Sequence, residues 1–115
     1  MSRASAGAAS QVRDAAPLFA ALGDETRLRL IIRLSSGGPG SITQLSAKSA
    51  VSRQAITKHL RVLSDAGLVQ SSRRGRERVW DLETKRLADA HAYLDRISKQ
   101  WDEALDRLRA LVEPS

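Results

Sequence analysis

The residues that decide the fold run from Ser52 to Val69 and read SRQAITKHLRVLSDAGLV. At about 100° of rotation per residue, the apolar side chains of this stretch share one face of a helix, and the polar donors lie opposite. The apolar face comprises Ile56, Leu60, Leu63 and Ala66, and the polar face comprises Gln54, Lys58 and Arg61, with Arg53 and Thr57 on the flank. Ser52 suits the N-cap, and Gly67 suits the left-handed position just past a helix end. We therefore expect one amphipathic helix whose exposed side consists of hydrogen-bond donors.

Two helices are expected shortly before this one. The first covers Glu25–Ser35, with Asp24 as its N-cap. The second covers Ile42–Lys48, with Ser41 as its N-cap. Between them, the Gly- and Pro-rich cluster Ser36–Gly40 is the strongest break in the chain. The residues expected to face inward are Leu28, Ile31, Ile32, Leu34, Ile42 and Leu45, and those expected on the outer flanks are Arg27, Arg29 and Arg33.

A β-hairpin is expected after the amphipathic helix. Its strands are Leu68–Arg73 and Arg78–Leu82, which are short and contain β-branched or aromatic residues. The connection Arg74–Glu77 places a glycine in the turn and makes the tip strongly cationic. Two helices joined by a tight turn and followed by a hairpin form the winged helix-turn-helix plan. The expected fold class is therefore mainly α with a small β-hairpin.

The pattern becomes helical again from Thr84 to Val112, with apolar residues spaced three and four apart. They are Leu87, Ala90, Leu94, Ile97, Trp101, Ala104, Leu108 and Leu111. This seam is three to four heptads long. A single domain can bury such a stripe against its own core, but at about 1.5 Å per residue the helix exceeds roughly 40 Å, which a small core does not cover. Part of the helix is expected to meet another chain.

The chain as a whole divides into three parts on this interpretation. Residues 1–14, rich in Ala, Ser and Gly without apolar periodicity, are expected to be a mobile tail, followed by a short helix that begins at Pro17. Residues 15–82 form the winged helix-turn-helix core, and residues 83–115 form the long dimerisation helix. No stretch is apolar enough to span a membrane, so a cytoplasmic protein is expected.

Charge points to a polyanionic partner. The 115 residues carry a formal net charge of +6, and the stretch Val51–Trp80 holds seven basic and two acidic residues. A solvated basic surface is the alternative, but the charge coincides with the exposed face of the amphipathic helix. Only four aromatic residues are present, and they are too scattered to stack single-stranded bases. Double-stranded DNA is therefore the expected partner.

Three runs of the sequence closely resemble the ArsR family of bacterial winged-helix repressors. They are ALGDETRLRLIIRL from Ala21, the stretch from Ser52 already quoted, and RRGRERVWDL from Arg73. The resemblance covers about residues 17–112. It implies a homodimer that binds a palindromic operator and represses transcription, with dimer contacts from the first and last helices. The dimer contacts expected here are Leu18, Leu87, Leu94, Ile97, Trp101 and Leu108.

The DNA contacts follow from this plan. Arg53, Gln54 and Thr57, at the start of the helix, are expected to read base edges in the major groove. Lys58 and Arg61 are expected to contact phosphates, and Ser52 to cap the helix, contact a phosphate, or both. The arginines expected to reach flanking phosphates or the minor groove are Arg73, Arg74, Arg76 and Arg78. Arg78 has an alternative structural role, stacking on Trp80.

No catalytic site or cofactor is expected. Cysteine is absent, and the sequence contains no Ser-His-Asp arrangement or phosphate-binding glycine loop. His59 is expected to pack or contact a phosphate. Family members that sense zinc place four ligands on the last helix. Asp89 and His91 match the first two, but Asp102 and Leu105 replace the others, so no metal site is expected.

Two alternative functions remain open from the sequence. One is a metal-responsive repressor that uses Asp89, His91 and Asp102 across a dimer. The other is an architectural DNA-binding or protein-interaction module whose working surface is the long helix. The sequence does not identify an effector.

Overall fold

The computed structural model describes residues 3–47 and 49–112. In chain order the elements are α1 (Arg3–Leu22), α2 (Glu25–Gly37), β1 (Gly40–Ser41), α3 (Ile42–Ser46), α4 (Arg53–Asp65), β2 (Val69–Arg74), β3 (Glu77–Leu82) and α5 (Thr84–Val112). The expected order of helices and hairpin is confirmed. Lys48, expected to end the second short helix, lies outside the described residues. None of the described helices has the length and apolarity that crossing a membrane requires.

Capping residues begin the helices of the core. Asp24 accepts a hydrogen bond from the Arg27 amide, and Ser52 accepts one from the Ala55 amide. Ser41 and Gln44 form a reciprocal capping box, in which each side chain accepts from the other residue's backbone N–H. These side chains satisfy amides that the helix itself leaves without partners, which explains why the expected starting points of α2, α3 and α4 are confirmed.

The sheet has three antiparallel strands in the order β1-β3-β2. Strands β2 and β3 pair from Val69 opposite Leu82 to Arg74 opposite Glu77, which leaves a two-residue turn. Gly75 occupies the first turn position with φ of 64°, a conformation that costs glycine little. The sequence analysis missed β1, in which Gly40 and Ser41 pair with Trp80 and Val79. Because this strand has only two residues, it carries no periodic signal.

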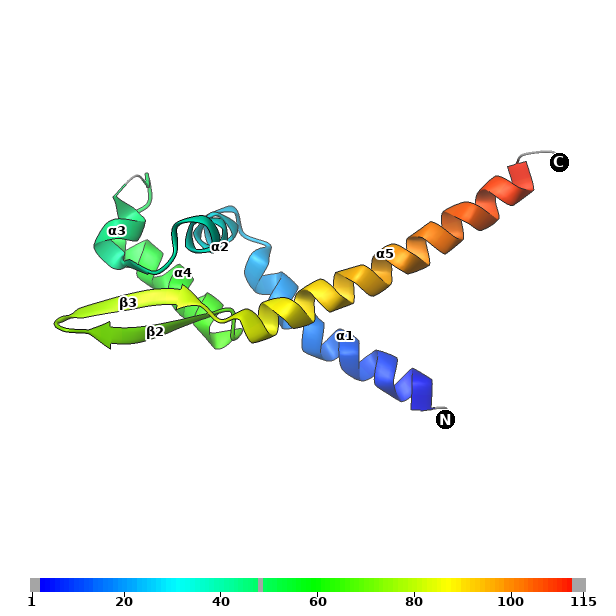
Figure 1. Ribbon diagram of the computed structural model, residues 1–115, viewed down its shortest axis with the longest axis horizontal. Helices are drawn as coiled ribbons and strands as arrows, with labels where there is room; N and C mark the ends of the chain where they lie inside the picture. Colours follow the sequence, from blue (N-terminus) through cyan, green and yellow to red (C-terminus); the bar gives the residue numbers. More distant parts are fainter. Residues whose placement is uncertain (1–2, 48, 113–115) are drawn as a thin grey trace.

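The core forms where α1, α2, α4 and the hairpin meet. Its fully buried large side chains are Leu18, Leu34, Ile56, Leu60, Leu63 and Leu68. Only the beginning of α5 joins this core, through the buried Ala90 and the partly buried Leu87. The rest of α5 extends away from it (Figure 1).

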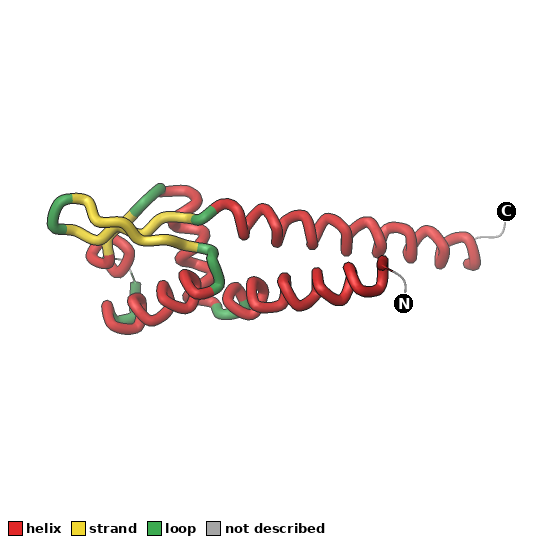
Figure 2. Tube along the Cα trace, turned by 90° about the horizontal axis from the view of Figure 1, so that it is seen from below, coloured by secondary structure: helices red, strands yellow, loops and turns green. Residues whose placement is uncertain are grey.

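Helix α5 crosses α1 and contacts it next to the core, and the two helices then diverge toward their free ends (Figure 1 and Figure 2). The rings of Phe19 and Tyr93 lie 5.8 Å apart, and Arg86 donates a hydrogen bond to the Asp14 carbonyl at 3.1 Å. The chain measures 66 × 35 × 20 Å, with a radius of gyration of 18.9 Å. A compact domain of this length has a radius of gyration of about 13 Å. The single chain is therefore strongly elongated.

The structure corrects the expected tail over residues 3–14 and the expected helix start at Pro17, because α1 is helical from Arg3 onward and contains Pro17 in its interior, while residues 1 and 2 lie outside the described residues. Two physical reasons explain the difference. The segment is rich in alanine, which has the highest helix propensity. It also has a tertiary partner, since Ala15 is buried and Asp14 accepts the hydrogen bond from Arg86. Apolar periodicity alone does not reveal such a helix.

The structure also corrects the inward face of α2. Ile31 and Leu34 are buried as expected, together with Leu30, but Leu28 is 45% exposed and Ile32 is 57% exposed. Arg27, expected on an outer flank, is part-buried and contacts α1 and α4. The apolar residues of α2 cover more of its circumference than one core contact can bury, so tertiary packing decides which of them face inward.

Candidate nucleic-acid interface

The helix-turn-helix unit consists of α3 and α4, and a side-chain contact joins the two helices. The Arg53 guanidinium donates a hydrogen bond to the Thr43 hydroxyl at 2.9 Å. The Thr57 hydroxyl donates to the Arg53 carbonyl one turn earlier, also at 2.9 Å. Thr43 is exposed and was missed by the sequence analysis. The sequence signal that could have identified Thr43 is its place as the second residue of the capped helix α3.

Helix α4 has the two faces that its sequence predicts. Ile56, Leu60 and Leu63 are buried, while Gln54, Lys58 and Arg61 are exposed. Across residues 3–47 and 49–112, these three exposed side chains form no hydrogen bond or ion pair. Their donors are therefore available to a ligand outside the chain.

The start of α4 adds backbone donors to this face. Ser52 is exposed and accepts from the Ala55 amide at 3.2 Å, and the Ile56 amide bonds to the Ser52 carbonyl. The amides of Arg53 and Gln54 precede the first intrahelical bond and have no intrahelical acceptor. A helix start of this kind attracts phosphate oxygens.

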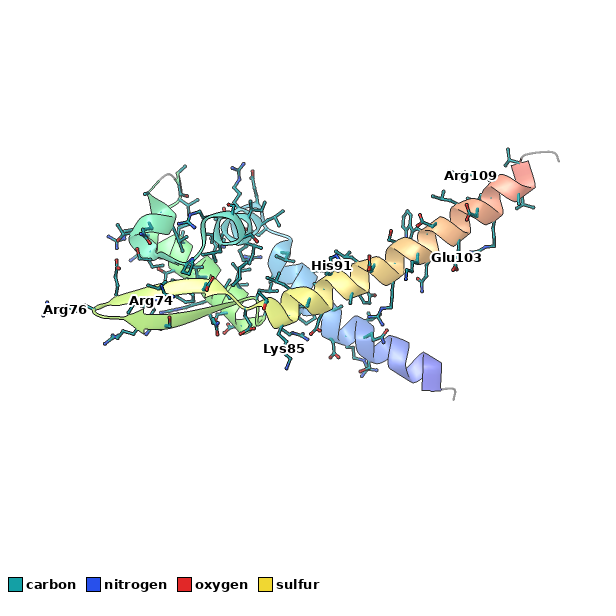
Figure 3. The ribbon with its side chains drawn as sticks, viewed as in Figure 1. Arg74, Arg76, Lys85, His91, Glu103 and Arg109 are labelled. Carbon is teal, nitrogen blue, oxygen red and sulfur yellow. The ribbon has the colours of Figure 1, made fainter. Side chains whose placement is uncertain are left out.

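The β2–β3 hairpin carries four arginines toward its outer end. Arg73 stands directly opposite Arg78 in the pairing, whereas Arg74 stands opposite Glu77. Arg76 occupies the turn, and Figure 3 shows Arg74 and Arg76 at the end of the molecule farthest from Arg109. Like charges directly opposite each other destabilise a strand pair. The Arg73–Arg78 pair therefore has an electrostatic cost that a bound polyanion would offset.

The alternative role of Arg78 is corrected by its contacts. Arg78 donates a hydrogen bond to the Ser71 hydroxyl at 2.8 Å rather than stacking on Trp80. Trp80 is buried in the core, and its indole N–H has no partner among the described residues. The cation–π contact found in the described chain joins Arg96 to Tyr93, both on α5, with 5.7 Å to the ring centroid.

The residues expected at a dimer contact divide into three groups. Leu94, Trp101 and Leu108 are exposed, and Ile97 is partly exposed, as a surface contact requires. Leu87 is partly buried and packs on the chain's own core. Leu18 is only 1% exposed, which corrects its assignment, because its side chain is already enclosed by its own chain. Leu105 and Val12 are further exposed apolar residues that were not among the expected dimer contacts.

The acidic and histidine residues of α5 do not form a metal centre within the described chain. No group of three or more His, Asp or Glu side chains gathers closely enough there to hold an ion. The Asp89 carboxylate instead pairs with Arg86 at 3.1 Å.

The fold and this surface define the class of protein: a winged helix-turn-helix protein with a basic hairpin and an exposed polar helix. Residues 22–71 match a family model described as a helix-turn-helix domain. The chain is 37% identical over 93 residues to the HTH-type transcriptional regulator Rv2034 of Mycobacterium tuberculosis, covering 81% of this chain and 83% of that one.

Solved structures give the same result. An ArsR-like transcriptional regulator from Rhodococcus sp. RHA1 superposes with a TM-score of 0.76 at 35% identity, over 92% of this chain and 99% of that one. The homodimeric winged helix-turn-helix DNA-binding domain of Mb0332 from Mycobacterium bovis shares the fold, with a TM-score of 0.62 at 20% identity, over 87% and 89% of the two chains. The chain belongs to the ArsR family of winged helix-turn-helix transcriptional regulators.

Proposed function

We propose that this regulator is a sequence-specific homodimer that represses transcription by binding a palindromic operator. Helix α4 enters the major groove, and the β2–β3 hairpin is the wing beside it. The observation that carries the proposal is the exposed face of α4, whose donors have no partner in the described chain, beside a hairpin whose arginines are exposed. Both features supply what base edges and phosphates accept.

The residues at the start of α4 read the bases. Gln54 is fully available, and a glutamine can form two hydrogen bonds with adenine. Arg53 is held by Thr43 at 2.9 Å in the free chain, so it exchanges this contact for guanine on binding. Thr57 lies one turn further along and is only partly exposed, which suits a contact to a thymine methyl group.

The remaining basic residues position the protein on the duplex. Lys58 and Arg61 contact phosphates along the groove, and Ser52 offers a phosphate the start of α4. Arg73, Arg74 and Arg78 contact the backbone beside the site, while Arg76 extends from the turn toward the minor groove. These contacts contribute affinity without base discrimination.

The elongated shape of the chain supports the proposed dimer. Beyond the core, α5 exposes Leu94, Trp101, Leu105 and Leu108 along one side, and Val12 of α1 is also exposed. Such a row of apolar side chains is typical of an interface. Because the Mb0332 domain of the same fold is homodimeric, a second copy is the partner that the fold favours. Two copies present two α4 helices, which matches a palindromic site.

Binding sites selected from a random duplex library test this function. We expect a two-half-site palindrome with centres about one helical turn apart, bound at least about a thousandfold more tightly than random duplex at the same salt concentration. Adding the protein should reduce transcription in vitro from a promoter that overlaps the selected site. Equal affinity for selected and random DNA would instead support an architectural module.

Gln54→Ala provides the residue-level version of this test, and Gln100→Ala, exposed on α5, is its matched control. The Gln54 variant should lose about 1–3 kcal/mol of discrimination at one base pair of each half-site, because it loses one bidentate base contact. The Gln100 variant should discriminate like the unmodified protein. Equal effects of the two substitutions would exclude Gln54 from base recognition.

A further inference from the structure

A small cavity lies between α1 and α5, beside the point where the two helices cross (Figure 1). Its volume is about 250 Å³. Sites for drug-sized ligands usually measure roughly 300–1,000 Å³, so this cavity suits a smaller metabolite. Its inner wall is apolar, because Leu18 is 1% exposed and Ala15 is 6% exposed, and Tyr93 also lines it.

Two charged side chains at this cavity have no charged partner of their own. The Arg96 guanidinium lies over the Tyr93 ring, and the Asp14 carbonyl accepts a hydrogen bond from Arg86. Among the side chains that the structure describes, neither Arg96 nor the Asp14 carboxylate forms an ion pair. The other two charged residues there, Arg86 and Asp89, pair with each other at 3.1 Å. The cavity therefore offers one available cation on α5 and one available anion on α1.

The cavity and the proposed dimer contact use different faces of α5. At about 100° of rotation per residue, Asp89, Tyr93 and Arg96 share the face that lines the cavity. The exposed apolar row from Leu94 to Leu108 is centred about a third of a turn away from that face. A second copy can therefore pack on the apolar row without using the face that lines the cavity.

We propose that this cavity binds a free α-amino acid with an apolar side chain. Such a molecule carries a carboxylate and an ammonium group on the same carbon at neutral pH. Its carboxylate pairs with Arg96, its ammonium group pairs with Asp14, and its side chain contacts Leu18 and Ala15. A ligand with only one of these charges would meet the like charge of Asp14 or Arg96 as well as the opposite one, so the zwitterion is the better match.

Arg86 connects this site to the proposed recognition helix. It donates to the Asp14 carbonyl at 3.1 Å, and its Cγ packs on Gly67, directly after α4, so closely that a Cβ there would lie 2.9 Å away. A ligand that pairs with Asp14 therefore acts on the residue that Arg86 holds, and through Arg86 on the end of α4. This coupling rests on the proposed function, whereas the ligand site does not.

Binding is tested without DNA, by following the amide chemical shifts of the protein during titration with L-leucine. We expect a dissociation constant below about 1 mM, with shifts at Asp14, Arg96 and Gly67. Two analogues keep the side chain of leucine: 4-methylpentanoate lacks the ammonium group, and 3-methylbutylamine lacks the carboxylate. Each should bind about tenfold more weakly, because each loses one charge-assisted contact. No shift with leucine, or equal affinity for an analogue, would overturn the inference.

Arg96→Gln tests the residue, and Arg107→Gln is its matched control, because Arg107 is exposed on the same face of α5 about three turns further on. The Arg96 variant should bind leucine about tenfold more weakly and 3-methylbutylamine no more weakly. The Arg107 variant should bind leucine like the unmodified protein. Equal losses in both variants would exclude Arg96 from the site. Thermal unfolding checks that both variants fold.

A last measurement separates the site from the proposed function. Saturating leucine should change the affinity of the unmodified protein for its selected DNA site by at least about fivefold, in contrast to the Arg96 variant at the same leucine concentration. If leucine binds while no duplex is selected, the proposed function fails and the ligand site stands. If leucine binds while the affinity for DNA stays constant, the coupling through Arg86 is wrong.

Discussion

At the scale of single residues, the proposed interface depends mainly on exposed polar side chains that do not hold the fold together. Gln54, Lys58 and Arg61 are exposed and form no hydrogen bond or ion pair in the described chain, and Arg76 occupies a turn whose left-handed position is filled by Gly75. By contrast, Arg27 and Arg33 bond to carbonyls and hold the fold together. The arginines of this chain thus fall into two groups, those that stabilise the fold and those that are free to bind a ligand. Only their contacts in the structure distinguish the two groups.

Arg76→Ala tests the role of the hairpin tip, with Arg109→Ala as a control that removes the same charge from the opposite end of the molecule (Figure 3). Because each phosphate contact releases counterions, the slope of log affinity against log salt should become shallower by about two units in the Arg76 variant, one per protomer. The slope of the Arg109 variant should not change. Affinity measured at several salt concentrations checks this, and equal slopes for all proteins would remove the wing from the mechanism.

At the scale of elements, glycine conformation determines how α4 and the hairpin connect to their neighbours. Gly67 ends α4 with φ of 80°, and Gly75 turns the hairpin with φ of 64°. The two glycines differ in their surroundings. A Cβ at Gly67 would lie 2.9 Å from Cγ of Arg86, whereas a Cβ at Gly75 would meet nothing within 4 Å. The connection after α4 is therefore packed against α5, and the hairpin turn is open.

These surroundings predict different costs for two substitutions with the same backbone requirement. Gly75→Ala should destabilise the fold by about 1 kcal/mol, the cost of an alanine in the left-handed region. Gly67→Ala should cost more, because Arg86 must also move away from its contacts with Asp14 and Asp89. Urea unfolding of both variants measures the difference. A larger loss of stability for Gly75→Ala would contradict the packing described around α4.

At the scale of the whole molecule, the single chain is elongated, and much of α5 is not covered by the rest of the chain. Its radius of gyration of 18.9 Å belongs to a rod with the hairpin at one end and the end of α5 at the other (Figure 1). Trp101 is 68% exposed on this rod, whereas Trp80 is 6% exposed in the core. A second copy placed against α5 would cover Trp101 and leave the environment of Trp80 unchanged.

The two tryptophans therefore report dimer formation. As protein concentration rises, tryptophan emission should shift to the blue, because Trp101 moves from water into the interface. Trp101→Phe should retain the emission of Trp80 and lose the concentration dependence. Sedimentation equilibrium of the unmodified protein should show a dimer over the same concentration range. A monomer at every concentration would exclude the proposed dimer and, with it, the palindromic site.

Local patterns in the sequence were sufficient for the order of helices and hairpin, the caps at Asp24, Ser41 and Ser52, and the two faces of α4. Each depends on neighbours within one or two turns, so the stretch contains the whole signal. The polar face of α4 was predictable for the same reason, since periodicity alone separates donors from core residues.

Only the tertiary structure decided the remaining features. It turned Leu30 rather than Leu28 inward, enclosed Leu18, and extended α1 back to Arg3. It also brought Arg27 to His59, 32 residues further along the chain. These outcomes depend on which surfaces meet, because packing selects among apolar faces of similar quality and long side chains reach whatever lies opposite. The two partners of such a contact lie too far apart in the sequence for a local pattern of one or two helical turns to predict it.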